Sequence, residues 1–185
     1  MAKITWTVLL CLFAAGCSPV MVSLPYNPAT TAEINANIEV DKFEYQPSKP
    51  EIKQNQIRTT AMGTTLLTEN VDDFFTNAVK REFRQAGISL KPGAKCKVAG
   101  EVNDFAVDDL GYSATYITNV HYSVMNSNGA ILYDNIEEVK FNTSKFVVAQ
   151  VIYANLNKVI SDNINKLLTN PDFINVVSTK CVSGK

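Results

Sequence analysis

The sequence predicts an α+β protein, a two-layer sandwich in which an antiparallel sheet of about four strands carries two helices on one face. Three observations lead to this class. Apolar and polar residues alternate over residues 33–45, and they alternate again in three successive stretches over 95–142. Two segments, near 70–86 and 144–168, repeat apolar residues at helical spacing. The expected order is strand, helix, three strands and helix.

The first predicted strand begins with a regular alternation over residues 34–40. After a phase slip, Phe43 and Tyr45 continue the pattern, which indicates a β-bulge. Residues 46–68 are polar and contain two prolines near their start, so they predict a long loop or a short irregular strand.

The first predicted helix begins after Asn70, a residue type that favours the N-cap, and ends before Gly87, which suits a left-handed C-terminal position. Acidic residues occupy its first turn, where the helix dipole favours negative charge. One largely apolar stripe is expected to face the sheet, formed by Val71, Phe74, Phe75, Ala78, Val79, Glu82, Phe83 and Ala86.

Residues 95–142 predict an antiparallel meander of three strands. The second strand covers about 113–125, and the turn Asn126-Ser127-Asn128-Gly129 is a strong hairpin signal that leads into the third. One face of the first strand carries Cys96, Val98, Gly100 and Val102.

The second predicted helix runs from about Ser144 to Leu168. Thr169-Asn170-Pro171 ends it, and the apolar residues between 173 and 177 are expected to pack as a short tail. Its buried stripe is expected to consist of Ile152, Leu156, Val159, Ile160, Ile164, Leu167 and Leu168.

The start of this helix is apolar around its whole circumference, whereas a two-layer sandwich buries only one stripe of a helix. The surplus either docks a partner or a second copy of the chain, or lies beneath the 46–68 loop or the C-terminal tail. The possible partner face comprises Phe146, Val147, Val151 and Tyr153.

The first 16 residues have the organisation of an export signal. Lys3 provides a positive charge, residues 4–13 form an apolar run broken only by threonines, and small residues follow at 14–16. The run is too short to cross a bilayer, because a spanning helix needs about 20 apolar residues. We therefore expect residues 1–16 to be removed.

The residues Ala14-Ala15-Gly16-Cys17 resemble the lipobox of bacterial lipoproteins. The resemblance implies cleavage before Cys17, transfer of a diacylglycerol to its sulfur and acylation of the new amino group. In such lipoproteins a serine after the cysteine permits transfer to the outer membrane, so Ser18 implies a lipid anchor on its periplasmic face. Surface display, and an ordinary signal followed by a coincidental cysteine, are the alternatives.

The prolines that follow predict that residues 17–32 are extended. Combined with the lipobox resemblance, this implies a lipidated extended tether over 17–32 and a single periplasmic domain over 33–185. Alternation at Val20, Val22 and Leu24 allows part of the tether to add an edge strand.

The mature chain would carry 16 basic and 18 acidic residues once Lys3 is removed, which gives no electrostatic basis for binding nucleic acid or anionic lipid. Cys96 and Cys181 remain in an oxidising compartment, and we expect them to form a disulfide that closes a loop of about 85 residues. The alternative is two free thiols too far apart to pair. Two cysteines and one distant histidine do not make a zinc site.

No catalytic set is recognisable, and we expect neither enzymatic activity nor a cofactor. His121, the single histidine, is expected to be an exposed strand residue and not a base. The adjacent pairs Asp108-Asp109 and Glu137-Glu138 are expected to be solvated charges beside turns, because neighbouring strand residues point to opposite faces.

The lipobox, the proline-containing tether, Gln85-Ala86-Gly87-Ile88, Val98-Ala99-Gly100-Glu101-Val102 and the long final helix resemble small outer-membrane auxiliary lipoproteins of the YajG-like, LptE-like and PqiC-like types. The resemblance implies a non-catalytic accessory subunit of a cell-envelope complex, such as a secretion system, with protein partners and a possible homo-oligomer. The alternative is a lipoprotein that binds a lipid or another envelope ligand in a transport pathway.

Overall fold

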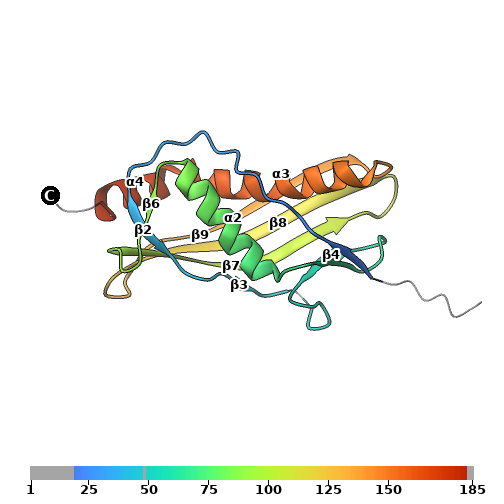
Figure 1. Ribbon diagram of the computed structural model, residues 1–185, viewed down its shortest axis with the longest axis horizontal. Helices are drawn as coiled ribbons and strands as arrows, with labels where there is room; N and C mark the ends of the chain where they lie inside the picture. Colours follow the sequence, from blue (N-terminus) through green and yellow to red (C-terminus); the bar gives the residue numbers. More distant parts are fainter. Residues whose placement is uncertain (1–18, 48, 183–185) are drawn as a thin grey trace, which may run out of the picture.

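The computed structural model describes residues 19–47 and 49–182, which form one mixed sheet with helices on one of its faces (Figure 1). Within these residues the sheet has nine strands and there are three helices. The predicted antiparallel sheet of about four strands with two helices is therefore wrong. In chain order the elements are β1 (Val20–Val22), β2 (Asn37–Val40), β3 (Glu44–Tyr45), β4 (Gln56–Thr59), β5 (Thr65–Leu67), α2 (Val71–Gln85), β6 (Ser89–Leu90), β7 (Cys96–Asp108), β8 (Ser113–Asn126), β9 (Ile131–Ser144), α3 (Ala149–Leu168) and α4 (Pro171–Lys180).

Strand β7 organises the sheet. One of its edges pairs antiparallel with β8, which pairs in turn with β9, so the predicted meander is confirmed. The other edge of β7 pairs in parallel with β2, β3 and β4 in succession along its length. Strand β6 lies beside β2, and β5 and then β1 lie beyond β4.

The parallel pairs explain why the sequence prediction of the sheet was wrong. The chain passes through α2 between β2 and β7, and strands joined by a helical crossover run in the same direction. The predicted phase slip appears as a break, since β2 ends at Val40 and β3 begins at Glu44. Strand β7 has its own register shift between Val102 and Asp104.

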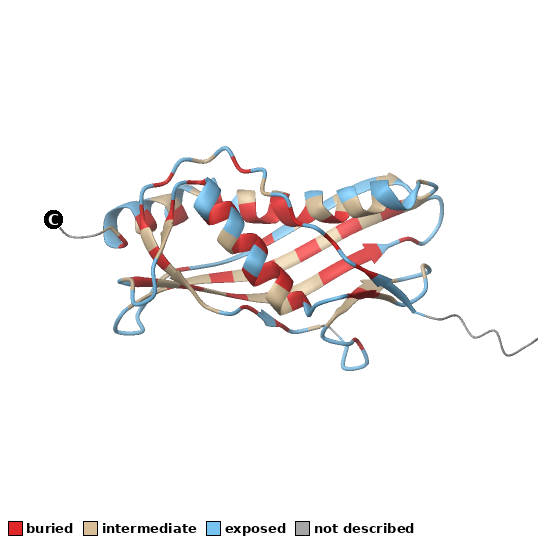
Figure 2. Ribbon diagram, in the orientation of Figure 1, coloured by how far each residue is buried: buried red, intermediate tan, exposed pale blue. Residues whose placement is uncertain are grey.

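The helices cover a single face of the sheet, and the core lies between the two layers (Figure 2). The predicted stripe of α2 is buried, and Gly87 has the left-handed φ of 85° expected after a helix. The expected C-terminal tail is instead α4. Asn170 caps this helix by accepting from the amides of Asp172 and Phe173, and Pro171 favours its first turn.

Cys96 and Cys181 are joined by a disulfide, with Cα atoms 5.4 Å apart, as predicted. The bond fastens the end of α4 to the first residue of β7. The backbone amide of Asn37 also donates to the carbonyl of Cys181 at 2.8 Å, so the C-terminal segment is held against β2 as well.

Residues 19–36, here called the N-terminal strap, contain most of the predicted tether; Cys17 and Ser18 lie outside the described residues. The strap begins with β1, confirming the suggested edge strand, and then crosses the helical layer to reach β2 (Figure 1). Val22, Leu24 and Tyr26 alternate with exposed residues and are buried. The described part of the tether therefore packs against the domain. No helix in the described ranges is long and apolar enough to span a bilayer.

Candidate binding site

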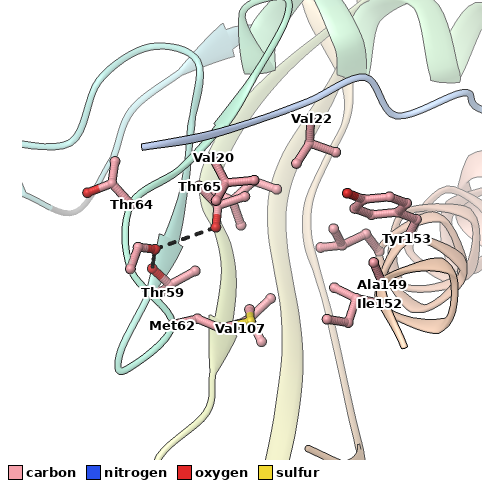
Figure 3. Close-up of a pocket in the computed structure, with 13 residues that line it drawn as sticks. Val20, Val22, Thr59, Met62, Thr64, Thr65, Val107, Ala149, Ile152 and Tyr153 are labelled. Atoms are coloured by element: carbon pink, nitrogen blue, oxygen red, sulfur yellow. Dashed lines mark hydrogen bonds between the residues drawn. The ribbon is translucent and has the colours of Figure 1, made fainter. Parts of the chain in front are cut away.

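An apolar cavity of about 290 Å³ lies at one end of the sheet, between the first turns of α3 and strands β1 and β5 (Figure 3). Ala149, Ile152 and Tyr153 project from α3 to form one wall. Val20 and Val22 of β1 contribute to the opposite wall. Val107, near the end of β7, also lines the cavity, together with Ile57, Thr59, Met62, Gly63, Thr64, Thr65 and Leu156.

The side chains that line this cavity leave it without charge. Apart from the hydroxyl of Tyr153, its polar side chains are threonines, and two of them turn toward the backbone. Thr59 Oγ1 donates to the Gly63 carbonyl at 3.0 Å, and Thr65 Oγ1 donates to the same oxygen at 3.5 Å. These hydroxyls are thus partly satisfied by the loop itself. Hydrocarbon is the ligand chemistry that such a lining suits best.

Three loops are held together at this end of the molecule by Asp109. Its Oδ1 accepts from the amides of Ala61 at 2.7 Å and Thr60 at 3.2 Å, and Lys145 Nζ lies 3.5 Å from Oδ2. Burial raises the pKa of Asp109, but the two amides and Lys145 outweigh burial, so the pKa lies below its ordinary value. The carboxylate therefore joins the 59–65 loop to the β7–β8 turn and to the segment before α3.

Asp109 corrects one sequence expectation, since the two acidic pairs are not solvated throughout. Asp109 and Glu137 are buried, whereas Asp108 and Glu138 are exposed. The alternation of β9 turns Glu137 inward, and Asp109, the first residue after β7, is also buried; each faces a lysine. For Glu137 this partner is the amino group of Lys166, at 3.1 Å.

Exposed apolar side chains surround the same end of the molecule. Tyr112 retains 89% of its accessible surface and Phe146 retains 75%. The loops that carry them are adjacent, because the amide of Lys145 donates to the Tyr112 carbonyl at 3.4 Å. Val20 both lines the cavity and is exposed. We call the exposed residues of this end the apolar rim: Val20, Met21, Leu110, Tyr112, Phe146 and Val148.

The structure divides the predicted partner face. Phe146 and Val151 are exposed, Val147 is half-buried, and Tyr153 lines the cavity. The alternative in which the 46–68 loop covers this face is only partly realised. The 59–65 segment approaches α3 but forms the opposite wall of the cavity instead of covering the helix. The sequence does not indicate that wall, because the segment is polar and shows no periodic pattern.

His121 lies on β8, on the sheet face opposite the helices, but it is half-buried and not exposed as predicted. Its Nε2 is 2.5 Å from Asp134 and its Nδ1 is 3.6 Å from Glu101, which places one carboxylate on each side of the ring. Within the ranges that the structure covers, no group of three or more His, Cys, Asp or Glu residues could hold a metal ion.

Neither a protein-family model nor a curated protein sequence matches the chain. The chain is similar to several solved structures. A Xanthomonas campestris protein of the family DUF330 superposes with a TM-score of 0.63 at 14% identity, covering 82% of this chain and 92% of that one. A putative lipoprotein from Caulobacter crescentus gives 0.46 at 14% identity, with 67% and 92% covered. The PelC dodecamer from Paraburkholderia phytofirmans gives 0.42 at 10% identity, with 81% and 95% covered.

Proposed function

We propose that this protein is a non-catalytic lipoprotein of the bacterial cell envelope, anchored through Cys17, whose cavity binds the hydrocarbon chain of a lipid. One observation carries the proposal: an uncharged apolar cavity opens beside β1, where the chain enters the domain three residues after Cys17. An anchored protein with this arrangement holds its binding site close to a source of acyl chains.

The size of the cavity suits a hydrocarbon chain better than a complete phospholipid. Its volume of about 290 Å³ is roughly twice that of the engineered apolar cavity of about 150 Å³ that binds benzene. Each methylene that leaves water contributes about 0.8 kcal/mol, so a chain of several methylenes gains enough to bind. Gly63 and Thr64 are exposed at the cavity, which leaves room for a polar headgroup in solvent.

A matched pair of tryptophan substitutions on α3 tests hydrocarbon binding. Ala149 lines the cavity, whereas Ala154 is exposed on the same helix and does not. We expect Ala149→Trp to weaken binding of cis-parinaric acid, a fluorescent fatty acid, by about tenfold or more, equivalent to about 1.4 kcal/mol. Ala154→Trp should bind like the unsubstituted protein. Equal affinity in both variants, or no saturable binding at all, would refute a ligand in this cavity.

Anchorage is tested separately from ligand binding. Radioactive palmitate should label the protein, and Cys17→Ser should abolish the label and release the protein from membranes. We also propose that Ser18 directs the protein to the periplasmic face of the outer membrane. Ser18→Asp should then shift it toward the inner-membrane fractions of a density gradient, and an unchanged distribution would contradict this role.

A second candidate function is that of an accessory subunit in an envelope complex, such as a secretion system. It is favoured by strand β9, which pairs in the sheet with β8 alone among the described strands and so leaves its other edge for a partner strand. Extraction in mild detergent followed by pull-down should recover the same partners in a defined ratio. Recovery of a monomer without partners would exclude this function.

A further inference from the structure

We infer that the apolar rim inserts into the lipid leaflet that holds the anchor, so that the protein stands on the membrane with its cavity at the bilayer surface. This inference rests on the proposed lipidation of Cys17. It adds an orientation and a contact surface that an anchor alone does not impose, because a lipidated protein can also lie on its side or extend away from the membrane.

Only a short length of chain separates the anchor from the rim. Cys17 precedes Val20 by three residues, and successive Cα atoms are about 3.8 Å apart, so the two Cα atoms are separated by at most about 11 Å. Val20 is hydrogen-bonded into the domain, since its amide donates to the Thr64 carbonyl at 3.0 Å. The lipid is therefore attached close to this end of the domain and cannot reach the opposite one.

The rim itself has the chemistry of a membrane-contacting surface. Four loop residues, Leu110, Tyr112, Phe146 and Val148, are well exposed, and β1 adds Val20 and Met21. Aromatic and branched apolar side chains of this kind are those that occupy the boundary between headgroups and acyl chains. Among the described residues, the other well-exposed large apolar side chains are Val151, near the rim on α3, and Ile131 and Ile136 on β9.

Charge at the tips of the loops would oppose insertion. Lys145 directly precedes Phe146, but its amino group is turned inward, where it donates to the Asp109 carbonyl at 2.5 Å and faces the Asp109 carboxylate. Asp108 lies at the base of the β7–β8 turn, and its carboxylate accepts from the amide of Leu110 at 3.4 Å. The tips of both loops consequently present apolar side chains, while the exposed carboxylate of Asp108 stays at the base of its turn.

The orientation has a consequence for the cavity. Val20 belongs to both the rim and the cavity lining, and Ala149 follows Val148 directly. Insertion of the rim therefore brings the cavity to the bilayer surface. A hydrocarbon chain would enter it from the membrane without crossing water.

Introduced tryptophans test the inference directly, because Trp6, the single tryptophan of the sequence, belongs to the predicted signal peptide. The mature lipidated protein is reconstituted into phosphatidylethanolamine–phosphatidylglycerol vesicles that contain brominated lipid, which quenches tryptophan near acyl chains. Phe146→Trp and Tyr112→Trp report on the rim. Ile136→Trp, at an exposed apolar position on β9, is the matched control.

We expect the two rim tryptophans to emit at shorter wavelength in vesicles and to lose most of their emission to brominated lipid, while the Ile136→Trp emission is unchanged. Equal quenching at all three positions, or none at any position in protein that floats with the vesicles, would overturn the orientation. Flotation distinguishes this failure from failure of the anchor. Protein that does not float would contradict lipidation, and with it both the proposed function and the orientation.

Discussion

The hydroxyl of Tyr26 donates a 2.6 Å hydrogen bond to the buried carboxylate of Glu82, joining the N-terminal strap to α2 across 56 residues of sequence. The same carboxylate accepts from the amides of Ala29 and Thr30 and from the hydroxyl of Ser161 on α3. No cation of the described residues forms an ion pair with it. Hydrogen-bond donors alone therefore compensate for its burial, and they fasten the strap to both helices.

Substitution of Glu82 should release the strap. Burial and the hydrogen bond to Glu82 raise the pKa of Tyr26 far above its ordinary value, so its hydroxyl remains a donor. Glu82→Gln presents an NH₂ group to donors that need an acceptor, and we expect the free energy of unfolding to fall by about 3 kcal/mol in urea titration. Tyr26→Phe should cost about 1.5–3 kcal/mol.

The exposed Tyr112 provides the control for this pair, and Tyr112→Phe should change stability by no more than about 0.5 kcal/mol. The double variant Tyr26→Phe/Glu82→Gln should lose less than the sum of the two single losses, because both remove the same hydrogen bond. Strict additivity would show that the two side chains do not act together.

The disulfide should contribute a large share of the stability. Cys96 and Cys181 are separated by 85 residues. Closing a loop of this length lowers the conformational entropy of the unfolded chain, which raises the free energy of unfolding by about 4 kcal/mol. Cys96→Ser/Cys181→Ser should lower the urea midpoint accordingly. Reductant should lower the midpoint of the original protein to a similar value and leave the double variant unchanged. A reductant-insensitive original protein would argue against the bond.

Elements whose signal lies within one continuous segment could be predicted from the sequence. The stripe of α2 from Val71 to Ala86 is buried as expected, and the three long strands occupy nearly the predicted ranges. In these elements the apolar residues recur at the period of the helix or strand because they are the residues that face the core. The pairing of Cys96 with Cys181 was also predictable, because two cysteines allow one pairing.

The remaining features depend on contacts between distant segments. Strands β5 and β6 contain three and two residues, too few for a periodic pattern, and they exist because a neighbouring strand offers backbone partners. The cavity is a product of such contacts. One wall was visible as the apolar start of α3, whereas the other comes from a threonine-rich loop positioned by Asp109.

Gly100 should not tolerate a larger residue. A Cβ atom built at this position would lie 2.3 Å from Cε2 of the buried Phe43, so the aromatic ring occupies the space that a side chain would need. We expect Gly100→Ala to lower the free energy of unfolding by about 1–3 kcal/mol through overpacking. Gly100→Ala should cost less when Phe43 is already replaced. The double variant Phe43→Leu/Gly100→Ala should therefore differ less from Phe43→Leu than Gly100→Ala differs from the original protein. An unaffected Gly100→Ala protein would contradict this close packing.

Asp109→Asn should loosen the cavity end of the molecule in a pH-dependent way. Because the folded-state pKa of Asp109 is lowered, its ionised form stabilises the fold above the unfolded-state pKa of about 3.9. That contribution declines as the pH falls through the folded-state pKa. At pH 7 the variant should lose about 1.5–3 kcal/mol, because an amide replaces a carboxylate that accepts two backbone hydrogen bonds and faces Lys145.

Asp108→Asn, at the exposed neighbouring residue, should stay within about 0.5 kcal/mol of the original protein. Urea titrations at pH 7 and pH 3 check the sign, because the deficit of Asp109→Asn should shrink at the lower pH. A deficit of equal size at both values would mean that the carboxylate charge does not hold these loops together.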